Sequence, residues 1–143
     1  MKAVAYLVAS LMTLAPVTSE SPQRVEYCDL AKRPERFASK TVIVQARLTE
    51  LKQGEWGLDS QCFQPTLITL PDDLQPKPDF QLEKSEGVRL MLQARRERNV
   101  LFRGDFVGRF DFAEQTAFGK SKVRTRLVLR DVQNAERITI PGK

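Results

Sequence analysis

The chain has 143 residues, a formal net charge of +5, two cysteines and no histidine. Without histidine, a Ser-His triad, a metzincin-type metal site and an imidazole pH switch are all excluded. The basic excess is compatible with a polyanionic partner, but it is weaker than the clustered charge of a dedicated nucleic-acid-binding protein.

Residues 1–19 predict a secretory signal peptide. Lys2 precedes an apolar run over residues 3–14, Pro16 breaks the run, and small residues follow it. An uncleaved anchor is the alternative, although the run is shorter than the ~20 apolar residues of a membrane span. We expect cleavage after Ser19 and no stable membrane span afterwards. Residues 20–143 then form a single periplasmic or secreted domain, whose 22 basic and 18 acidic residues leave a net charge of +4.

The two cysteines of an exported chain predict a disulfide between Cys28 and Cys62. The bond would close a loop of about 35 residues and stabilise the fold by roughly 3–4 kcal/mol. Two free thiols are the alternative. A catalytic thiol would lack a histidine base, and two lone cysteines do not indicate zinc.

The first expected element is a short helix. Residues 21–24 form a polar lead-in, and residues 29–37 predict a helix that Asp29 caps and that a proline keeps short. Leu30 and Phe37 are its expected buried contacts.

A meander of three strands follows. Alternating apolar and polar residues over 40–51 predict the first strand, and residues 52–55 predict a turn at Gly54. Residues 56–61 and 66–70 predict the second and third strands. The inward face of the first strand is Val42, Val44, Ala46 and Leu48.

Prolines exclude regular structure over residues 71–79. Residues 82–98 then predict a helix, although Gly87 costs it about 1 kcal/mol. A strand over residues 88–94 is the alternative.

Two long strands complete the domain, over residues 99–112 and 123–132, and the tail after Asn134 is expected to fray. Gly104 and Gly108 predict a sharp coil in the first of them, as when a sheet closes on itself. The expected inward residues are Val100, Phe102, Phe106, Phe110, Phe112, Val123, Thr125, Leu127 and Leu129. The expected outward residues are Arg103, Asp105, Val107, Arg109, Asp111, Arg124, Arg126 and Arg130.

This order of elements is that of the OB-fold, a five-stranded Greek-key barrel. The segments CDL, PERF, KTVIVQARL, WGLDSQC, VLFRGDFVGRF and LVLRDV resemble small exported bacterial OB-fold proteins of mostly unassigned function. The glycine-bearing strand and the LVLRDV segment carry the resemblance, while Ala46 stands where such families commonly have glycine. The resemblance implies a mainly β barrel with one helix between strands three and four and a short N-terminal helix.

The single tryptophan, Trp56, is the main candidate for ligand contact. OB-fold ligands lie across strands two and three, between the first–second and fourth–fifth loops. Aromatic rings and cations in those loops are suited to stacking on bases or sugars. In the alternative interpretation Trp56 plugs the barrel end, on the same side as Leu58. The predicted ligand-binding residues are Trp56, Phe118, Lys120, Lys122 and Arg126.

The outward arginines fall into two groups. Those of the fourth strand are expected to pair with neighbouring acids, Arg103 and Arg109 with Asp105, Asp111 or Glu50. Those of the last strand have no acid on their own face and are better candidates for an anionic partner: Arg124, Arg126 and Arg130. Residues 94–98, ARRER, are interpreted as a solvated helix end, with targeting or nucleic-acid contact as alternatives.

Catalysis would depend on carboxylates. The candidate pairs for a hard cation, as in a carboxylate–metal nuclease, are Asp72 with Asp73 and Asp59 with Glu55. The first pair lies in a proline-rich segment typical of a turn, and no phosphate-binding loop or nucleophile elbow is present.

The sequence therefore predicts a non-catalytic binding module of the cell envelope, without cofactor or metal, for an anionic or sugar-containing ligand. The expected partners are an oligosaccharide, an oligonucleotide or an envelope protein. An assembly module is the alternative, and a carboxylate–metal nuclease is a weaker one.

Overall fold

The computed structural model describes residues 21–141, apart from residues 53, 60–61, 63–64 and 118. The side chains of residues 113–117 and 120–123 are also outside the description. The predicted signal peptide therefore lies outside the described residues. Within the described ranges, no helix is long and apolar enough to cross a membrane.

The fold is mainly β. Its strands are β1 (Gln23–Val25), β2 (Thr41–Lys52), β3 (Glu55–Asp59), β4 (Thr66–Thr69), β5 (Val100–Ala117) and β6 (Lys120–Thr139). Its helices are α1 (Tyr27–Lys32) and α2 (Glu86–Ala94), with short 3-10 turns η1 (Pro34–Arg36) and η2 (Pro71–Asp73).

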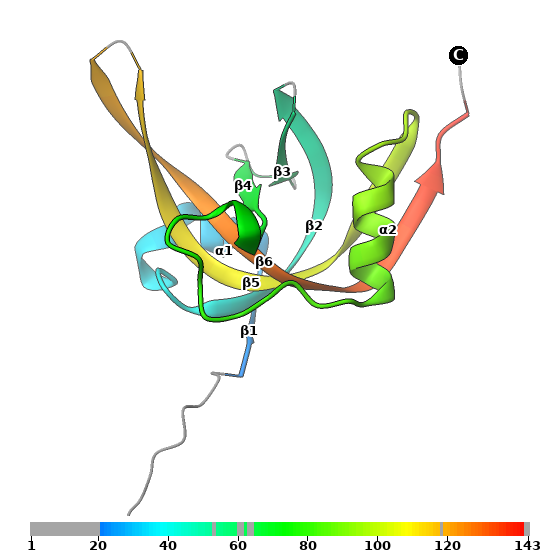
Figure 1. The fold of residues 1–143 in the computed structure, drawn as a ribbon, viewed down its shortest axis with the longest axis horizontal. Coiled ribbons are helices and arrows are strands. Elements are labelled where there is room, and N and C mark those ends of the chain that lie inside the picture. Colours follow the sequence, from blue (N-terminus) through cyan, green and yellow to red (C-terminus); the bar gives the residue numbers. More distant parts are fainter. Residues whose placement is uncertain (1–20, 53, 60–61, 63–64, 118, 142–143) are drawn as a thin grey trace, which may run out of the picture.

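The order in which five of the strands pair is cyclic, beginning and ending at β2. β2 is antiparallel to both β3 and β5, and β3 is antiparallel to β4. β4 is parallel to β6, which is antiparallel to β5. The sheet therefore curls into a partial ring, with β1 added in parallel to β2 and α2 standing over one end (Figure 1).

The core lies on the inner side of this ring. The predicted inward faces of β2, β5 and β6 are confirmed in the middle of these strands, where the alternating apolar residues are buried. Towards the strand ends, Val100, Phe112 and Thr125 are only partly buried. Phe102 and Phe106 pack edge to face, with ring centroids 6.1 Å apart. The largest fully buried side chains include Val42, Val44, Leu58, Met91, Phe102, Phe106, Phe110, Leu127 and Leu129.

The glycines of β5 allow the strong coiling of that strand. Gly104 and Gly108 lie opposite Ala46 and Val42 of β2, and the ladder with β6 shifts register beside each glycine. A Cβ atom at Gly108 would overlap the Val128 carbonyl. Close approach of the two backbones therefore requires glycine there, as expected for a sheet that curls on itself.

Helix α2 is shorter at both ends than the predicted helix over residues 82–98, since it begins at Glu86 and ends at Ala94. Ser85 is the N-cap: its hydroxyl accepts a hydrogen bond from the Val88 amide at 3.2 Å and donates one to Asp131 at 2.6 Å. The residues before it are extended, and the Glu83 amide donates to the Arg130 carbonyl at 2.8 Å. The helix start is thus decided by contacts with β6 rather than by apolar spacing.

Three boundary predictions near the N-terminus and C-terminus are wrong. The lead-in at residues 21–24 contains most of β1. Asp29 lies within the first turn of α1, which starts at Tyr27 and has no side-chain cap. The tail after Asn134 does not fray, because β6 pairs with β5 as far as Thr139. The polar residues of that tail are held by the β5 ladder, which apolar periodicity cannot reveal.

The predicted disulfide is confirmed. Cys28 and Cys62 are bonded, with Cα atoms 5.6 Å apart and a sequence separation of 34. The bond joins α1 to the segment between β3 and β4.

The outer face of β5 and β6 is partly covered, contrary to the prediction that it is solvent-exposed. Asp105 and Val107 were expected outward but are only 5% and 3% exposed, and Val128 of β6 is fully buried. The segment between η2 and α2 runs across these strands (Figure 1). Its Phe80 lies under the Arg109 guanidinium, 5.8 Å from the ring centroid.

Candidate ligand site at Trp56

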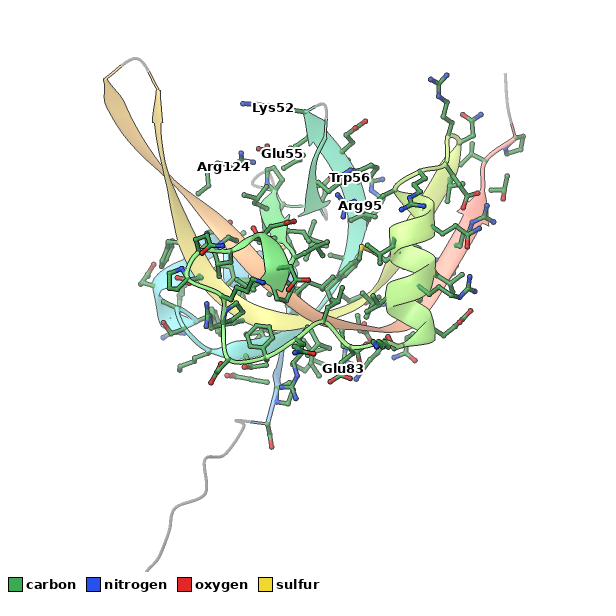
Figure 2. All side chains as sticks on the ribbon, in the orientation of Figure 1. Lys52, Glu55, Trp56, Glu83, Arg95 and Arg124 are labelled. Atoms are coloured by element: carbon green, nitrogen blue, oxygen red, sulfur yellow. A yellow bond between two sulfur atoms is a disulfide. The ribbon has the colours of Figure 1, made fainter. Side chains whose placement is uncertain are left out.

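Trp56 lies on the inner side of β3, at the end of the ring that faces α2. Leu58, two residues further along the same side of the strand, is fully buried. Trp56 is half-buried and packs against the same core. Figure 2 shows Trp56 of β3 and Arg95 at the end of α2 pointing toward one another.

The space between β3 and α2 is a cavity of about 330 Å³. Three apolar side chains and two guanidinium groups line it: Trp56, Leu70, Leu92, Arg95 and Arg96. The volume falls in the range of small-molecule sites, which combine a mostly apolar lining with a few polar groups.

The charge of this cavity is not neutralised within the described chain. The Arg95 ζ carbon lies 5.7 Å from the centroid of the Trp56 ring, the geometry of a cation–π contact. Among the described residues, neither Arg95 nor Arg96 has a carboxylate within 4.0 Å. A guanidinium that stacks by its face keeps its N–H edge available for an anion.

The structure places two of the sequence-predicted ligand-binding residues, Trp56 and Arg126, on opposite sides of the sheet. Trp56 is on the inner side of the sheet, whereas Arg126 is on the outer side, between the inward residues Thr125 and Leu127. Phe118 lies outside the described residues. Lys120 and Lys122 belong to β6 by backbone, but their side chains lie outside the description.

The expectation that the β6 arginines face no acid is wrong for Arg124 and Arg126, because neighbouring strands supply the acids. Arg124 binds Glu55 of β3 at 2.9 Å, as the labelled pair in Figure 2 shows, and Arg126 lies 3.4 Å from Asp111 of β5. The Arg126 Nε atom is buried and has no hydrogen-bond partner in the described part of the chain. Period-2 counting along one strand does not detect pairs of this kind.

The β5 arginines are paired, as predicted, but only one of them with an expected acid. Arg109 lies 3.8 Å from Asp111, whereas Arg103 binds Glu136 of β6 at 2.9 Å. Asp105 binds Arg24 of β1 instead, at 3.1 Å.

The sequence-based interpretation missed the part of the site that α2 contributes. Arg95 and Arg96 belong to the ARRER segment, which was interpreted as a solvated helix end. A signal was available, because Leu92, Arg95 and Arg96 have the i, i+3, i+4 spacing of one helix face. The sequence does not show that this face of the helix lies against Trp56.

The carboxylates considered for catalysis are either paired with arginines or exposed on the surface. Glu55 is held by Arg124, and Asp59 by Arg47 at 3.0 Å. Asp72 is exposed, with Lys77 at 4.0 Å. Among the residues with a described position, no cluster of three acids, cysteines or histidines is arranged to hold a metal ion.

A second cavity, of about 400 Å³, lies beside β1 and is lined by Arg24, Val25, Glu26, Tyr27, Cys28 and Gln45. Its guanidinium, Arg24, is already bound to Asp105. The Tyr27 hydroxyl donates to the Leu58 carbonyl at 2.8 Å, and burial raises the pKa of this tyrosine although its hydrogen bonds with Thr66 oppose the shift. The smaller cavity at Trp56 is the better candidate because its cations are not paired with any carboxylate of the described residues.

No family model matches this chain, and neither does any curated protein or solved structure. The interpretation of the site therefore depends on its geometry and charge.

Proposed function

We propose that this chain is an exported, non-catalytic binding module with an OB-like barrel, and that it holds an anionic ligand in the Trp56 cavity. The strand order β2-β3-β4-β6-β5, returning to β2 with a helix between β4 and β5, supports an OB-like arrangement. The disulfide is compatible with an oxidising compartment.

One observation carries the binding proposal: two guanidinium groups that have no carboxylate partner among the described residues line the same cavity as an indole. An indole offers stacking or apolar contact worth about 1–3 kcal/mol for a stacked ring. A guanidinium adds charge-assisted hydrogen bonds to an anion. A ring or sugar that bears a negative charge would use both at once.

The fluorescence of Trp56 reports directly on this site, because it is the only tryptophan. We expect an anionic sugar, such as glucuronate, to change the emission saturably, and molar salt to weaken the change. Glucose, which lacks the carboxylate, should bind less tightly.

Variants test whether the change in emission arises from binding in the Trp56 cavity. Arg95→Gln with Arg96→Gln should abolish the response, whereas Arg103→Gln, which removes an exposed arginine paired with Glu136, should preserve it. An emission that no anion changes, or an equal loss in the Arg103→Gln control, would overturn the proposal.

A protein-interaction or assembly module is the second candidate. Ile138 and Ile140, at the end of β6, are 38% and 47% exposed. Exposed apolar side chains at a strand end suit contact with another protein. Sedimentation that depends on protein concentration, and that Ile138→Asp with Ile140→Asp removes, would favour this candidate.

A further inference from the structure

The geometry points to the chemical class of the ligand. We infer that the Trp56 cavity takes a single apolar or ring-bearing group that ends in one carboxylate, and not a stretch of polyanion. This inference rests on the proposed function and narrows it.

The size and lining of the cavity favour a compact, largely apolar group. About 330 Å³ accommodates one short aliphatic chain or one small ring system, but not several consecutive nucleotides or sugars. Trp56, Leu70 and Leu92 supply the apolar surface. Burying such a group contributes about 25 cal/mol for each Å² of apolar area removed from water.

The two arginines favour a carboxylate at one end of this group. The guanidinium carbon of Arg95 lies over the indole, 5.7 Å from the ring centroid. No described carboxylate lies within 4.0 Å of this guanidinium, so its N–H groups remain for a planar acceptor. Two parallel N–H···O bonds from one guanidinium match the two oxygens of a carboxylate. Arg96 lines the same cavity and adds a second positive charge.

The flanks of the site argue against a polyanion, which needs a continuous track of unpaired cations. On the β3 side, Glu55 precedes Trp56 and is bound by Arg124. On the α2 side, Glu97 follows Arg96 and is bound by Arg137. Each flank therefore carries an acid that already neutralises one cation.

Two kinds of ligand carry an apolar group that ends in one carboxylate. One is a small amphipathic acid, and the other is an apolar peptide with a free C-terminal carboxylate. The whole protein is titrated with decanoate and, separately, with decan-1-ol, both below the micellar concentration, and binding is followed by Trp56 emission. In parallel, acetyl-Ala-Leu-Leu with a free carboxylate is compared with its C-terminal amide. Oligothymidylate serves as the polyanion.

We expect decanoate, the free-acid peptide, or both to bind saturably, at least about tenfold more tightly than the alcohol or the amide. The tighter of the two acids identifies the source. Arg95→Gln with Arg96→Gln should remove the preference for the acid but leave weak binding of decan-1-ol. Arg103→Gln should behave as the unchanged protein.

The titrations distinguish a failure of this inference from a failure of the proposed function. If oligothymidylate binds through Arg95 and Arg96 more tightly than either acid, the inference is overturned and the proposed function stands. If decanoate and decan-1-ol bind equally, the carboxylate is not recognised and the inference is wrong. If no titrant changes the emission of a protein whose circular dichroism is that of a folded chain, both proposals fail together.

Discussion

Asp105 is a charged side chain in an unusually buried position, 5% exposed on the outer face of β5. It accepts hydrogen bonds from Arg24 at 3.1 Å and from the Asn134 side chain at 2.8 Å. Burial alone would raise its pKa, but the two hydrogen bonds and the charge of Arg24 outweigh burial, so the pKa lies below the ordinary 3.8. The carboxylate thereby ties β1 to the last two strands.

This shift predicts a loss of stability in acid. Because the pKa of Asp105 is lowered in the folded state, the carboxylate contributes stability above about pH 4, and that contribution disappears as the pH falls through the folded pKa. Asp105→Asn should be less stable than the unchanged protein at neutral pH, and the difference should shrink below about pH 3. Urea unfolding between pH 2 and pH 7, about the range where carboxylates titrate, measures it. A constant difference over this range would contradict the assignment.

The substitution Gly87→Ala is expected to have opposite effects on the stability of an isolated helix and of the folded protein. In an exposed helix, replacing glycine by alanine stabilises by about 1 kcal/mol. Here a Cβ atom would overlap the Val132 carbonyl of β6. We expect Gly87→Ala to destabilise the protein by roughly 1–3 kcal/mol.

The matched control is Gln93→Ala, at an exposed position of the same helix. Thermal unfolding followed by circular dichroism should show a lower midpoint for the glycine variant and little change for the control. A stabilising effect of Gly87→Ala would mean that α2 does not approach β6 as closely as described.

At the scale of elements, the end of β6 is the clearest departure from local pattern. After Asn134 the strand is mostly polar, yet it pairs with β5 through Val100, opposite Thr139. Two ion pairs add to the ladder: Arg103 with Glu136, and Arg137 with Glu97. Backbone pairing thus supports a segment that side-chain periodicity assigns to a tail.

Removal of residues 135–143 should therefore destabilise the domain by about 1–3 kcal/mol, in the range of other losses of paired structure. A shorter truncation that ends after Ile140 leaves β6 whole and is the control. Urea midpoints of the two truncated proteins measure the difference. Equal midpoints would show that the end of β6 contributes nothing to stability.

At the scale of the whole molecule, the Cys28–Cys62 bond crosses between the N-terminal helix and the strand meander. A loop of this length stabilises the folded state by roughly 3–4 kcal/mol, mainly by restricting the unfolded chain. Reduction, or Cys28→Ser with Cys62→Ser, should lower the free energy of unfolding by about that amount. Urea unfolding with and without reductant measures it, and reductant should not affect the double variant.

Several features of this protein follow from its sequence alone. Strict alternation in β2, β5 and β6 determines which residues face the core, because successive side chains of a strand point to opposite sides. The glycines of β5 indicate strong coiling, and two cysteines in a chain with an apolar leader indicate a disulfide. The helix between β4 and β5 also follows from apolar spacing, apart from its two ends.

The candidate ligand site was decided only by the tertiary structure. Arg124 and Glu55 are 69 residues apart, and Trp56 meets Arg95 from a different element. Contacts of this kind depend on strand register and on where α2 rests, which local patterns do not encode. The chain therefore specifies its core by short-range periodicity, while the pairing of its charges, and hence which arginines remain available to a ligand, depends on long-range packing.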